Sequence, residues 1–260
     1  MQLRAGPLLL FCCLCLAYAA SAADASLTNL LNDAERHDKK GETEAALKAY
    51  LEADRLAPGN ADILFSLAKQ YCDSMHLTKI RAAIKDCAAK ALACALRSEQ
   101  ADPQSPKTHV CVAVCLAKNF PYSDNQTRVN YSRQIKAEAE QAIALDPKYD
   151  LSYHMLGRWH CEVSNMNLFM RAMVRIAYGG LPKASPELAI QNFKKAIELS
   201  PNRIIHHLQL AKMYHLTGKE KLVTEELKQC CVLKPTDPDD QDAQNIAKKI
   251  LLDHKWPEEM

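Results

Sequence analysis

Apolar residues recur every three to four positions along most of the chain, which is the period of an amphipathic α-helix. The helical pattern returns in a series of units, and each unit ends at a proline. These closing prolines are Pro58, Pro103, Pro147, Pro201 and Pro235. Repetition at such intervals is typical of proteins built from stacked helical hairpins. The pattern therefore predicts an all-α repeat protein.

The run before each proline carries a second-helix signature. A small residue is followed by a large apolar one four positions later, a small one three further on, and proline after five more. The signature is complete in two units, at Ala46, Tyr50, Ala53 and Pro58, and again at Ala189, Phe193, Ala196 and Pro201. Small residues let two helices approach closely, and the large one fills the space between them. This spacing is that of the tetratricopeptide repeat (TPR).

The first helix of a unit has its own signature: a large residue, a small neighbour, and a ring three positions further on. It occurs at Leu67-Ala68 with Tyr71, at Leu156-Gly157 with His160, and at Leu210-Ala211 with Tyr214. The two signatures keep a constant offset across the closing prolines. Chance would rarely produce that agreement, so the repeat assignment rests on two independent patterns.

The closing prolines lie 45, 44, 54 and 34 residues apart. Only the last interval is the standard TPR length of about 34 residues, so we expect extra residues between the two helices of each earlier hairpin. Helix-start signals at Ser105-Pro106, Ser185-Pro186 and Asp237-Pro238 support these boundaries. The prediction is an irregular TPR-like solenoid over residues 23–260, with long inter-helix insertions and a C-terminal capping helix from Asp239 to Leu252.

Residues 1–22 have the features of a secretory signal peptide. Arg4 precedes a short apolar run from Pro7 to Ala17, and Ala20-Ser21-Ala22 offers a small-residue cleavage site. An uncleaved N-terminal anchor is the alternative. If the leader is cleaved, we expect a protein of the endoplasmic reticulum lumen or a secreted one, and the sequons at Asn125 and Asn130 fit that route.

Composition narrows the function further. The 33 basic and 31 acidic residues give a net charge of +2, so no overall field favours nucleic acid. The eight cysteines beyond the leader form no CxxC pair and no closely spaced zinc quartet, and we expect most of them to be small core residues. Neither a nucleophile motif nor a phosphate-binding or dinucleotide-binding motif is present, so we expect no enzyme, no cofactor and no metal.

In a TPR solenoid the first helices line the concave groove. Their ninth positions are basic in three units, at Lys69, Arg158 and Lys212, with His154 and His215 at neighbouring groove positions. A row of cations in a groove suits an acidic protein segment or a lipid headgroup. The alternative is that these long side chains merely extend from a solvated face.

The segment Asn165–Pro182 is a second candidate site, because it predicts an apolar helix with a basic stripe. Its proposed contact residues are Phe169, Met170, Arg171, Met173, Arg175 and Ile176. Such a helix can lie on an anionic membrane or form a lid over a cavity. The commoner alternative is a helix packed into the solenoid, with its methionines as adaptable core filler.

Several segments resemble one family. They are Tyr153-His-Met-Leu-Gly-Arg-Trp-His160, the insertion up to Gly180-Leu-Pro182, and Pro235-Thr-Asp-Pro-Asp-Asp240 before the last helix. Over roughly Asp33 to Leu252 the chain is similar to the regulator of microtubule dynamics proteins. The resemblance implies a non-enzymatic helical repeat domain associated with microtubules or spindle poles. In one branch it implies lipid binding at contacts between endoplasmic reticulum and mitochondria.

Two functions remain open at this point. The first is a scaffold whose groove binds an acidic segment of a protein, with tubulin the partner that the resemblance implies. The second is a lipid-binding or transfer module, in which the basic row binds phospholipid headgroups and the segment from Phe169 to Tyr178 covers the acyl chains. The resemblance also implies a cytoplasmic, microtubule-associated or N-terminally anchored location as the alternative to the secretory route.

Overall fold

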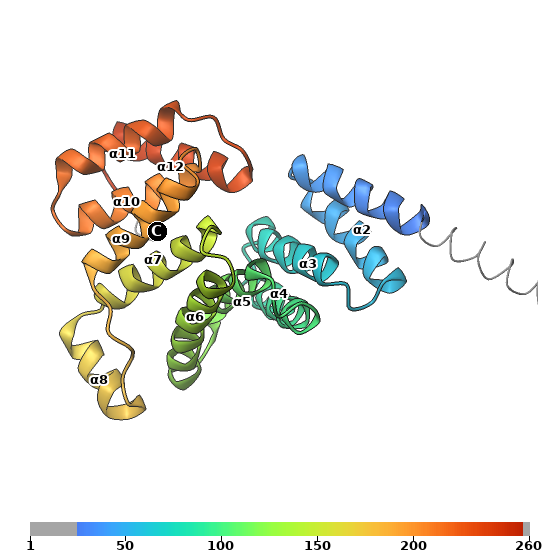
Figure 1. Ribbon diagram of the computed structural model, residues 1–260, viewed down its shortest axis with the longest axis horizontal. Helices are drawn as coiled ribbons and strands as arrows, with labels where there is room; N and C mark the ends of the chain where they lie inside the picture. Colours follow the sequence, from blue (N-terminus) through green and yellow to red (C-terminus); the bar gives the residue numbers. More distant parts are fainter. Residues whose placement is uncertain (1–24, 257–260) are drawn as a thin grey trace, which may run out of the picture.

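A computed structural model describes residues 25–256 of the chain. All regular secondary structure in this range is helical, and the helices stack in chain order as antiparallel pairs (Figure 1). A helix over residues 25–39 is followed by α2 (Thr43–Leu56), α3 (Ala61–Ser74), α4 (Arg81–Ala101), α5 (Pro106–Asn119), α6 (Asn125–Leu145), α7 (Asp150–Ser164), α8 (Leu168–Tyr178), α9 (Pro186–Leu199), α10 (Ile204–Leu216), α11 (Glu220–Val232) and α12 (Pro238–Asp253). The all-α prediction is confirmed.

The irregular intervals between prolines have a direct structural cause. Helices α4 and α6 each run for 21 residues, against 14 in α3 and α5, and a single 3-10 turn precedes each long helix, at Met75–Leu77 and Phe120–Tyr122. In the fourth hairpin α8 lies between α7 and α9, which nevertheless pack against each other. The predicted insertions between paired helices are therefore confirmed.

Capping explains where several helices begin. Ser185 accepts a hydrogen bond from the backbone N–H of Leu188 at 3.2 Å, and Asp237 accepts one from that of Asp240 at 2.9 Å. Each satisfies one of the N–H groups that the first turn of a helix leaves unpaired. Ser105 occupies the same position before α5 but makes no side-chain cap, so Pro106 alone marks that start.

A further repeat feature links hairpins. The fourth residue of three first helices bonds to the carbonyl oxygen of the proline that closes the preceding unit. The bonds are His109 Nε2 to Pro103 O at 3.0 Å, Tyr153 Oη to Pro147 O at 3.2 Å, and His207 Nε2 to Pro201 O at 3.0 Å. Because a carbonyl oxygen only accepts, each ring group must donate. The turn at each of these prolines is thereby fastened to the helix that follows it.

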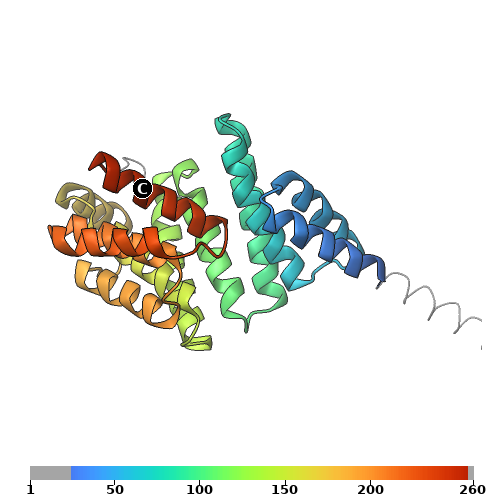
Figure 2. The same cartoon turned by 90° about the horizontal axis from the view of Figure 1, so that it is seen from above.

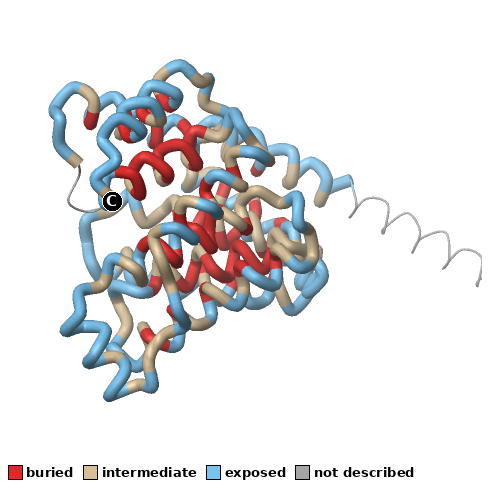
Figure 3. Tube along the Cα trace, turned by 60° about the vertical axis from the view of Figure 1, so that its left-hand side comes forward, coloured by how far each residue is buried: buried red, intermediate tan, exposed pale blue. Residues whose placement is uncertain are grey.

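Buried residues run as a continuous band along the stack (Figure 3). One apolar cluster extends from the first helix to α7, and a second joins α9, α10, α11 and α12. Helix α7 belongs to both, since Trp159 packs in the first cluster and Cys161 in the second. The view from above shows α12 lying across the end of the stack (Figure 2), which is the predicted capping position.

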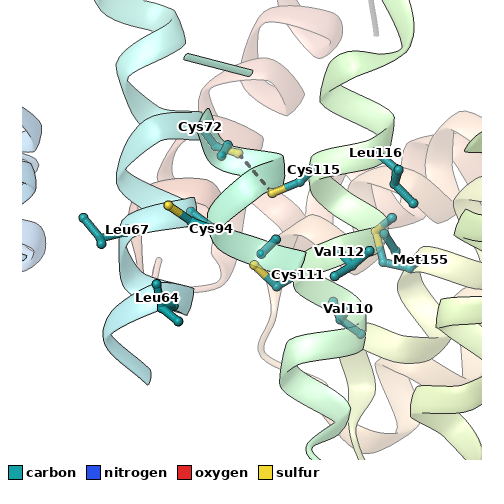
Figure 4. Close-up of a cluster of buried hydrophobic side chains, with 14 of the residues drawn as sticks. Leu64, Leu67, Cys72, Cys94, Val110, Cys111, Val112, Cys115, Leu116 and Met155 are labelled. Atoms are coloured by element: carbon teal, nitrogen blue, oxygen red, sulfur yellow. Dashed lines mark hydrogen bonds between the residues drawn. The ribbon is translucent and has the colours of Figure 1, made fainter. Parts of the chain in front are cut away.

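Six of the eight cysteines that the structure describes are buried, and all eight are free thiols. Cys72 of α3 and Cys115 of α5 approach most closely, with their Sγ atoms 3.9 Å apart in the first core cluster (Figure 4). The expected role as small core residues is confirmed for these six. The predicted signal peptide lies outside the described residues, and no helix within them is long and apolar enough to cross a membrane.

Candidate functional site

The three cations predicted for the groove have different environments. Lys69 of α3 contacts two carboxylates, Asp38 at 2.6 Å and Asp73 at 3.1 Å. Burial alone would lower the pKa of Lys69, but the hydrogen bond to Asp38 and the charge of Asp73 outweigh it and raise that pKa. Lys69 is therefore a charged group whose charge is already balanced.

Lys212 of α10 is also paired, to Glu162 of α7 at 3.1 Å. Arg158 of α7 is exposed, and within the described chain it forms no ion pair. The predicted row of cations is therefore uneven in its environment, and its binding role stays a prediction. Two of its members are neutralised by carboxylates from the same surface, and Arg158 is left available.

Acidic residues from the C-terminal helix also face this surface. Asp239 lies in the first turn of α12 and its side chain is exposed, yet desolvation by the surrounding chain raises its pKa. Repulsion from Asp237 and from Asp73 of α3 acts in the same direction, while Lys69 opposes it. The start of α12 thus lies within electrostatic reach of α3, and the charges on this surface alternate in sign.

His154 does not line the groove. It is only 6% exposed, because Phe193 of α9 and His206 of α10 cover it. His206 Nε2–H donates to Asp150 at 2.8 Å, so its Nδ1 accepts from His154 Nδ1–H at 2.9 Å. Burial, with repulsion from His206 and Arg158, holds the pKa of His154 well below its usual value, and the ring is a neutral core group.

His215 lies in the last turn of α10, three residues after Lys212. Its Nδ1 is 3.2 Å from Glu220, and its ring stacks on Trp256 with the ring centroids 5.0 Å apart. These contacts hold residues after α12 against the end of α10. The binding role of His215, like that of Arg158, stays a prediction.

One cluster of titratable groups is not visible in the spacing of the sequence. His109 Nδ1 lies 2.7 Å from Glu138 of α6 and 3.0 Å from Glu99 of α4. His207 has a simpler version of the arrangement, with its Nδ1 2.7 Å from Glu226 of α11. The partners lie on different helices, so hairpin stacking rather than any local motif brings them together.

Helix α8 has no buried residue and only Val174 and Tyr178 are half-buried, so the expectation that it packs into the solenoid is wrong. Leu168, Phe169 and Ile176 are 83%, 73% and 83% exposed, and Met170 and Met173 are about half exposed. The guanidinium of Arg171 instead turns towards the body, where it donates to the carbonyl oxygens of Val163 and Ser164 at the end of α7. The apolar face of α8 therefore points outward, away from the core.

An open cavity of about 700 Å³ lies between α8 and the segment that follows it. Its wall is largely apolar and includes Val163, Met166, Val174, Leu181, Pro182 and Leu188, with Arg171 and Arg175 at its polar side. Arg133 of α6 fastens the end of α8 by donating to the carbonyl oxygens of Tyr178 and Gly180. Of the residues predicted for a lid or membrane contact, Arg171 and Arg175 line this cavity, whereas Phe169 and Ile176 do not.

The fold and its repeated signatures define a helical-repeat protein of the TPR class. Solved structures agree with this. A thermophilic TPR protein from Thermus thermophilus superposes with a TM-score of 0.67 at 15% identity, covering 87% of this chain and 99% of that one. The pilF protein of Pseudomonas aeruginosa gives a TM-score of 0.55 at 13% identity, covering 90% and 87%. At these identities the likeness shows the fold alone.

The family follows from sequence. The profile described as regulator of microtubule dynamics protein 1-3 matches residues 30–255, and the chain belongs to this family. It is 27% identical to regulator of microtubule dynamics protein 1 of Mus musculus over 202 residues, which covers 77% of this chain and 66% of that one. It is 26% identical to regulator of microtubule dynamics protein 3 of Xenopus laevis over 236 residues, covering 90% and 51%. The chain thus spans between half and two thirds of these relatives, and the predicted resemblance is confirmed.

Proposed function

We propose that this protein is a non-catalytic scaffold whose concave surface binds an acidic segment of a partner protein, with Arg158 as the anchoring cation. The observation that carries the proposal is the contrast among the three groove cations. Lys69 and Lys212 are paired with carboxylates, whereas Arg158 is exposed and unpaired within the described residues. A guanidinium can bind a carboxylate through two parallel hydrogen bonds, which favours an acidic partner.

The paired lysines set the limits of the binding site. An incoming carboxylate would compete with Asp38 and Asp73 for Lys69, and with Glu162 for Lys212. Exchanging one carboxylate for another yields little net electrostatic gain at a surface. We therefore assign the affinity chiefly to Arg158 and regard the lysine pairs as boundaries that exclude a long, uniformly acidic ligand.

The absence of catalysis is part of the proposal. Three of the buried histidines, which would be natural acid–base groups, are engaged in contacts that hold helices together: His154 with His206, and His207 with Glu226. The partner that the family name suggests is the microtubule, so tubulin is the first candidate to test.

Co-sedimentation with stabilised microtubules tests this function. Arg158→Glu should lower the apparent affinity for microtubules, obtained from the fraction of protein that pellets, by at least about tenfold. The substitution turns the attraction to an acidic segment into repulsion. Lys194→Glu is the matched control, because Lys194 is an exposed cation on α9, the second helix of the same hairpin. Equal pelleting of the two variants would reject Arg158 as the anchor. No pelleting of the unmodified protein would reject tubulin as the partner.

One observation favours a second function, the binding of a lipid surface. The outward face of α8 carries Leu168, Phe169 and Ile176 almost fully exposed, and residues 165–186 contain three cations and no acidic residue. A helix of this kind can lie in the interface of an anionic membrane. The double variant Phe169→Ser with Ile176→Ser should then lose flotation with vesicles of phosphatidylcholine and phosphatidylserine.

The control for the vesicle experiment is Leu252→Ser, because Leu252 on α12 is 80% exposed and lies far from α8 in the chain. The lipid function is supported if the Leu252→Ser variant still floats with the vesicles and the double variant does not. Flotation that is absent in the unmodified protein, or equal in all three, would exclude it.

A further inference from the structure

Three consecutive helices bring three ligand-type atoms together at one point. Glu99 on α4, His109 on α5 and Glu138 on α6 each present one such atom, and all three lie within 4.8 Å of one another. His109 Nδ1 is 3.0 Å from Glu99 Oε1 and 2.7 Å from Glu138 Oε2. His109 is buried, whereas both glutamates are half-buried and reachable from solvent.

The other ring nitrogen fixes what His109 can do. Its Nε2 is 3.0 Å from the carbonyl oxygen of Pro103, which can only accept, so Nε2 carries a proton. A histidine that donates one N–H to a backbone carbonyl is oriented to offer its other nitrogen as a metal ligand. Nδ1 is therefore free either to hold a second proton or to coordinate a cation between the two carboxylates.

The cluster carries more negative charge than one histidine can balance. Both carboxylates contact the same ring nitrogen, at 3.0 Å for Glu99 and 2.7 Å for Glu138. Two ionised carboxylates carry two negative charges, whereas one imidazolium carries a single positive charge. A divalent cation would balance both carboxylates at once.

His207 provides an internal reference. It occupies the same position in its helix, its Nε2 is 3.0 Å from Pro201 O, and its Nδ1 is 2.7 Å from Glu226. One carboxylate therefore suffices for the structural clamp between a first helix and its partner. Glu99 is the group that His109 has in addition, and fastening the hairpin does not require it.

We propose that Glu99, His109 and Glu138 form a divalent metal site of the Zn²⁺ type. His109 Nδ1 and one oxygen of each glutamate are the ligands, and water from the exposed side completes the coordination. Tetrahedral zinc with nitrogen and oxygen ligands at about 2.0–2.1 Å places neighbouring ligand atoms about 3.3 Å apart. The oxygens of Glu99 and Glu138 would have to move away from His109 Nδ1 by only about 0.3 Å and 0.6 Å to reach that separation. The metal would tie the second hairpin to the third.

The donor set separates this site from the nearby thiols. Histidine nitrogen and carboxylate oxygen are both ligands of Zn²⁺. Cobalt bound by such ligands lacks the charge-transfer absorption that thiolate ligation gives. Cys111 is two residues from His109 but belongs to the cysteine group with Cys72 and Cys115 in the core. The absorption spectrum of bound cobalt therefore shows whether the metal binds to the Glu99, His109 and Glu138 cluster or to the cysteines.

The test uses the full chain, stripped with a chelator and kept reduced with a phosphine. Zn²⁺ should raise the midpoint of thermal unfolding, and Co²⁺ should give visible d–d bands without thiolate charge transfer. Glu99→Gln keeps the shape but removes a ligand, and it should weaken Zn²⁺ binding, measured by calorimetry, by at least about tenfold. Glu226→Gln, which changes the reference cluster at His207, should leave Zn²⁺ binding unchanged.

Glu138→Gln is the second variant, in case Glu99→Gln disturbs the fold as judged by helical circular dichroism. It should also lose Zn²⁺ binding. The proposal is overturned if Zn²⁺ does not bind the unmodified chain, because the cluster then holds a shared proton only. It is equally overturned if both glutamine variants bind as tightly as the unmodified chain, or if cobalt shows thiolate ligation.

Discussion

The ring of Phe193 on α9 lies directly against Gly157 on α7. A Cβ atom at residue 157 would be 2.8 Å from both Cδ1 and Cε1 of that ring, closer than carbon atoms can pack. Phe193 itself is fully buried. The small residue of the first helix and the large residue of the second therefore form one contact, which holds α7 and α9 together across the insertion of α8.

Gly157→Ala should therefore destabilise the protein, although alanine normally favours a helix over glycine. We expect a loss of about 1–3 kcal/mol in the free energy of unfolding, because Phe193 has no free space into which it can move. Chemical denaturation followed by circular dichroism measures it. Adding Phe193→Leu should recover part of the loss. The contact would be contradicted if Gly157→Ala left the free energy of unfolding unchanged. It would also be contradicted if the losses from the two single substitutions simply added in the double variant.

His207 predicts a pH dependence of stability. Burial alone would lower its pKa, but the hydrogen bonds to Glu226 and to the Pro201 carbonyl outweigh it and raise the pKa. A raised folded-state pKa contributes stability that is present below the unfolded value of about 6.5 and is lost as pH rises through the folded value. Glu226→Gln should cost about 1.5–3 kcal/mol near pH 6, the range for hydrogen bonds to charged groups, and progressively less at higher pH.

Denaturant titrations of the unmodified protein and Glu226→Gln between pH 6 and pH 9 measure this difference. Thr224→Ala on the same helix is a suitable control, because Thr224 is exposed and its hydroxyl bonds only to the backbone of its own helix. A difference between Glu226→Gln and the unmodified protein that stays constant with pH would show that His207 is not charged in the fold.

The cysteines predict a pattern of chemical labelling. Cys87 and Cys231 are the half-buried members of the described set, so they should react first with iodoacetamide in the native protein. Cys115 should react last, because hydrogen bonding with Cys111 and Cys72, together with burial, raises its pKa well above the usual thiol value. Peptide mass spectrometry after brief labelling gives the order. Early modification of Cys115 would contradict the core arrangement.

The intact mass of the protein can decide whether the chain enters the secretory pathway. Cleavage after Ala22 and a glycan on Asn125 are the outcomes that the sequence predicts for the secretory route. Asn125 is exposed as the first residue of α6, so the side chain is accessible in the folded chain. Intact mass before and after glycosidase treatment of protein from a eukaryotic host measures both. An uncleaved, unglycosylated chain would favour the anchored or cytoplasmic alternative.

The repeat architecture was predictable because each hairpin is local in sequence. The small and large residues that meet in the structure, such as Gly157 and Phe193, occupy fixed positions relative to the closing prolines. Counting from the closing prolines also puts Lys69, Arg158 and Lys212 at the same position of their helices. It could not show which carboxylates these side chains contact. Asp38 and Glu162 approach these lysines only when neighbouring hairpins stack.

The remaining differences have the same origin. His154 was expected on the groove, yet Phe193 and His206 cover it because α9 and α10 close over that part of α7. The sequence leaves open whether helix α8 buries its apolar side, whereas in the structure Arg171 bonds to the end of α7 and the apolar side points outward. Tertiary contacts of single side chains, which no periodicity encodes, decide both cases.

The most direct test of the scaffold account is the affinity for an acidic peptide. A fluorescent peptide of alternating glutamate and glycine should bind the unmodified chain, with an anisotropy change that weakens as salt is added. Arg158→Glu should lower that affinity by at least about tenfold, whereas Lys194→Glu should stay close to the unmodified value. Equal affinities for Arg158→Glu and Lys194→Glu would contradict the binding of an acidic segment at Arg158. An affinity that does not change with salt concentration would contradict it as well.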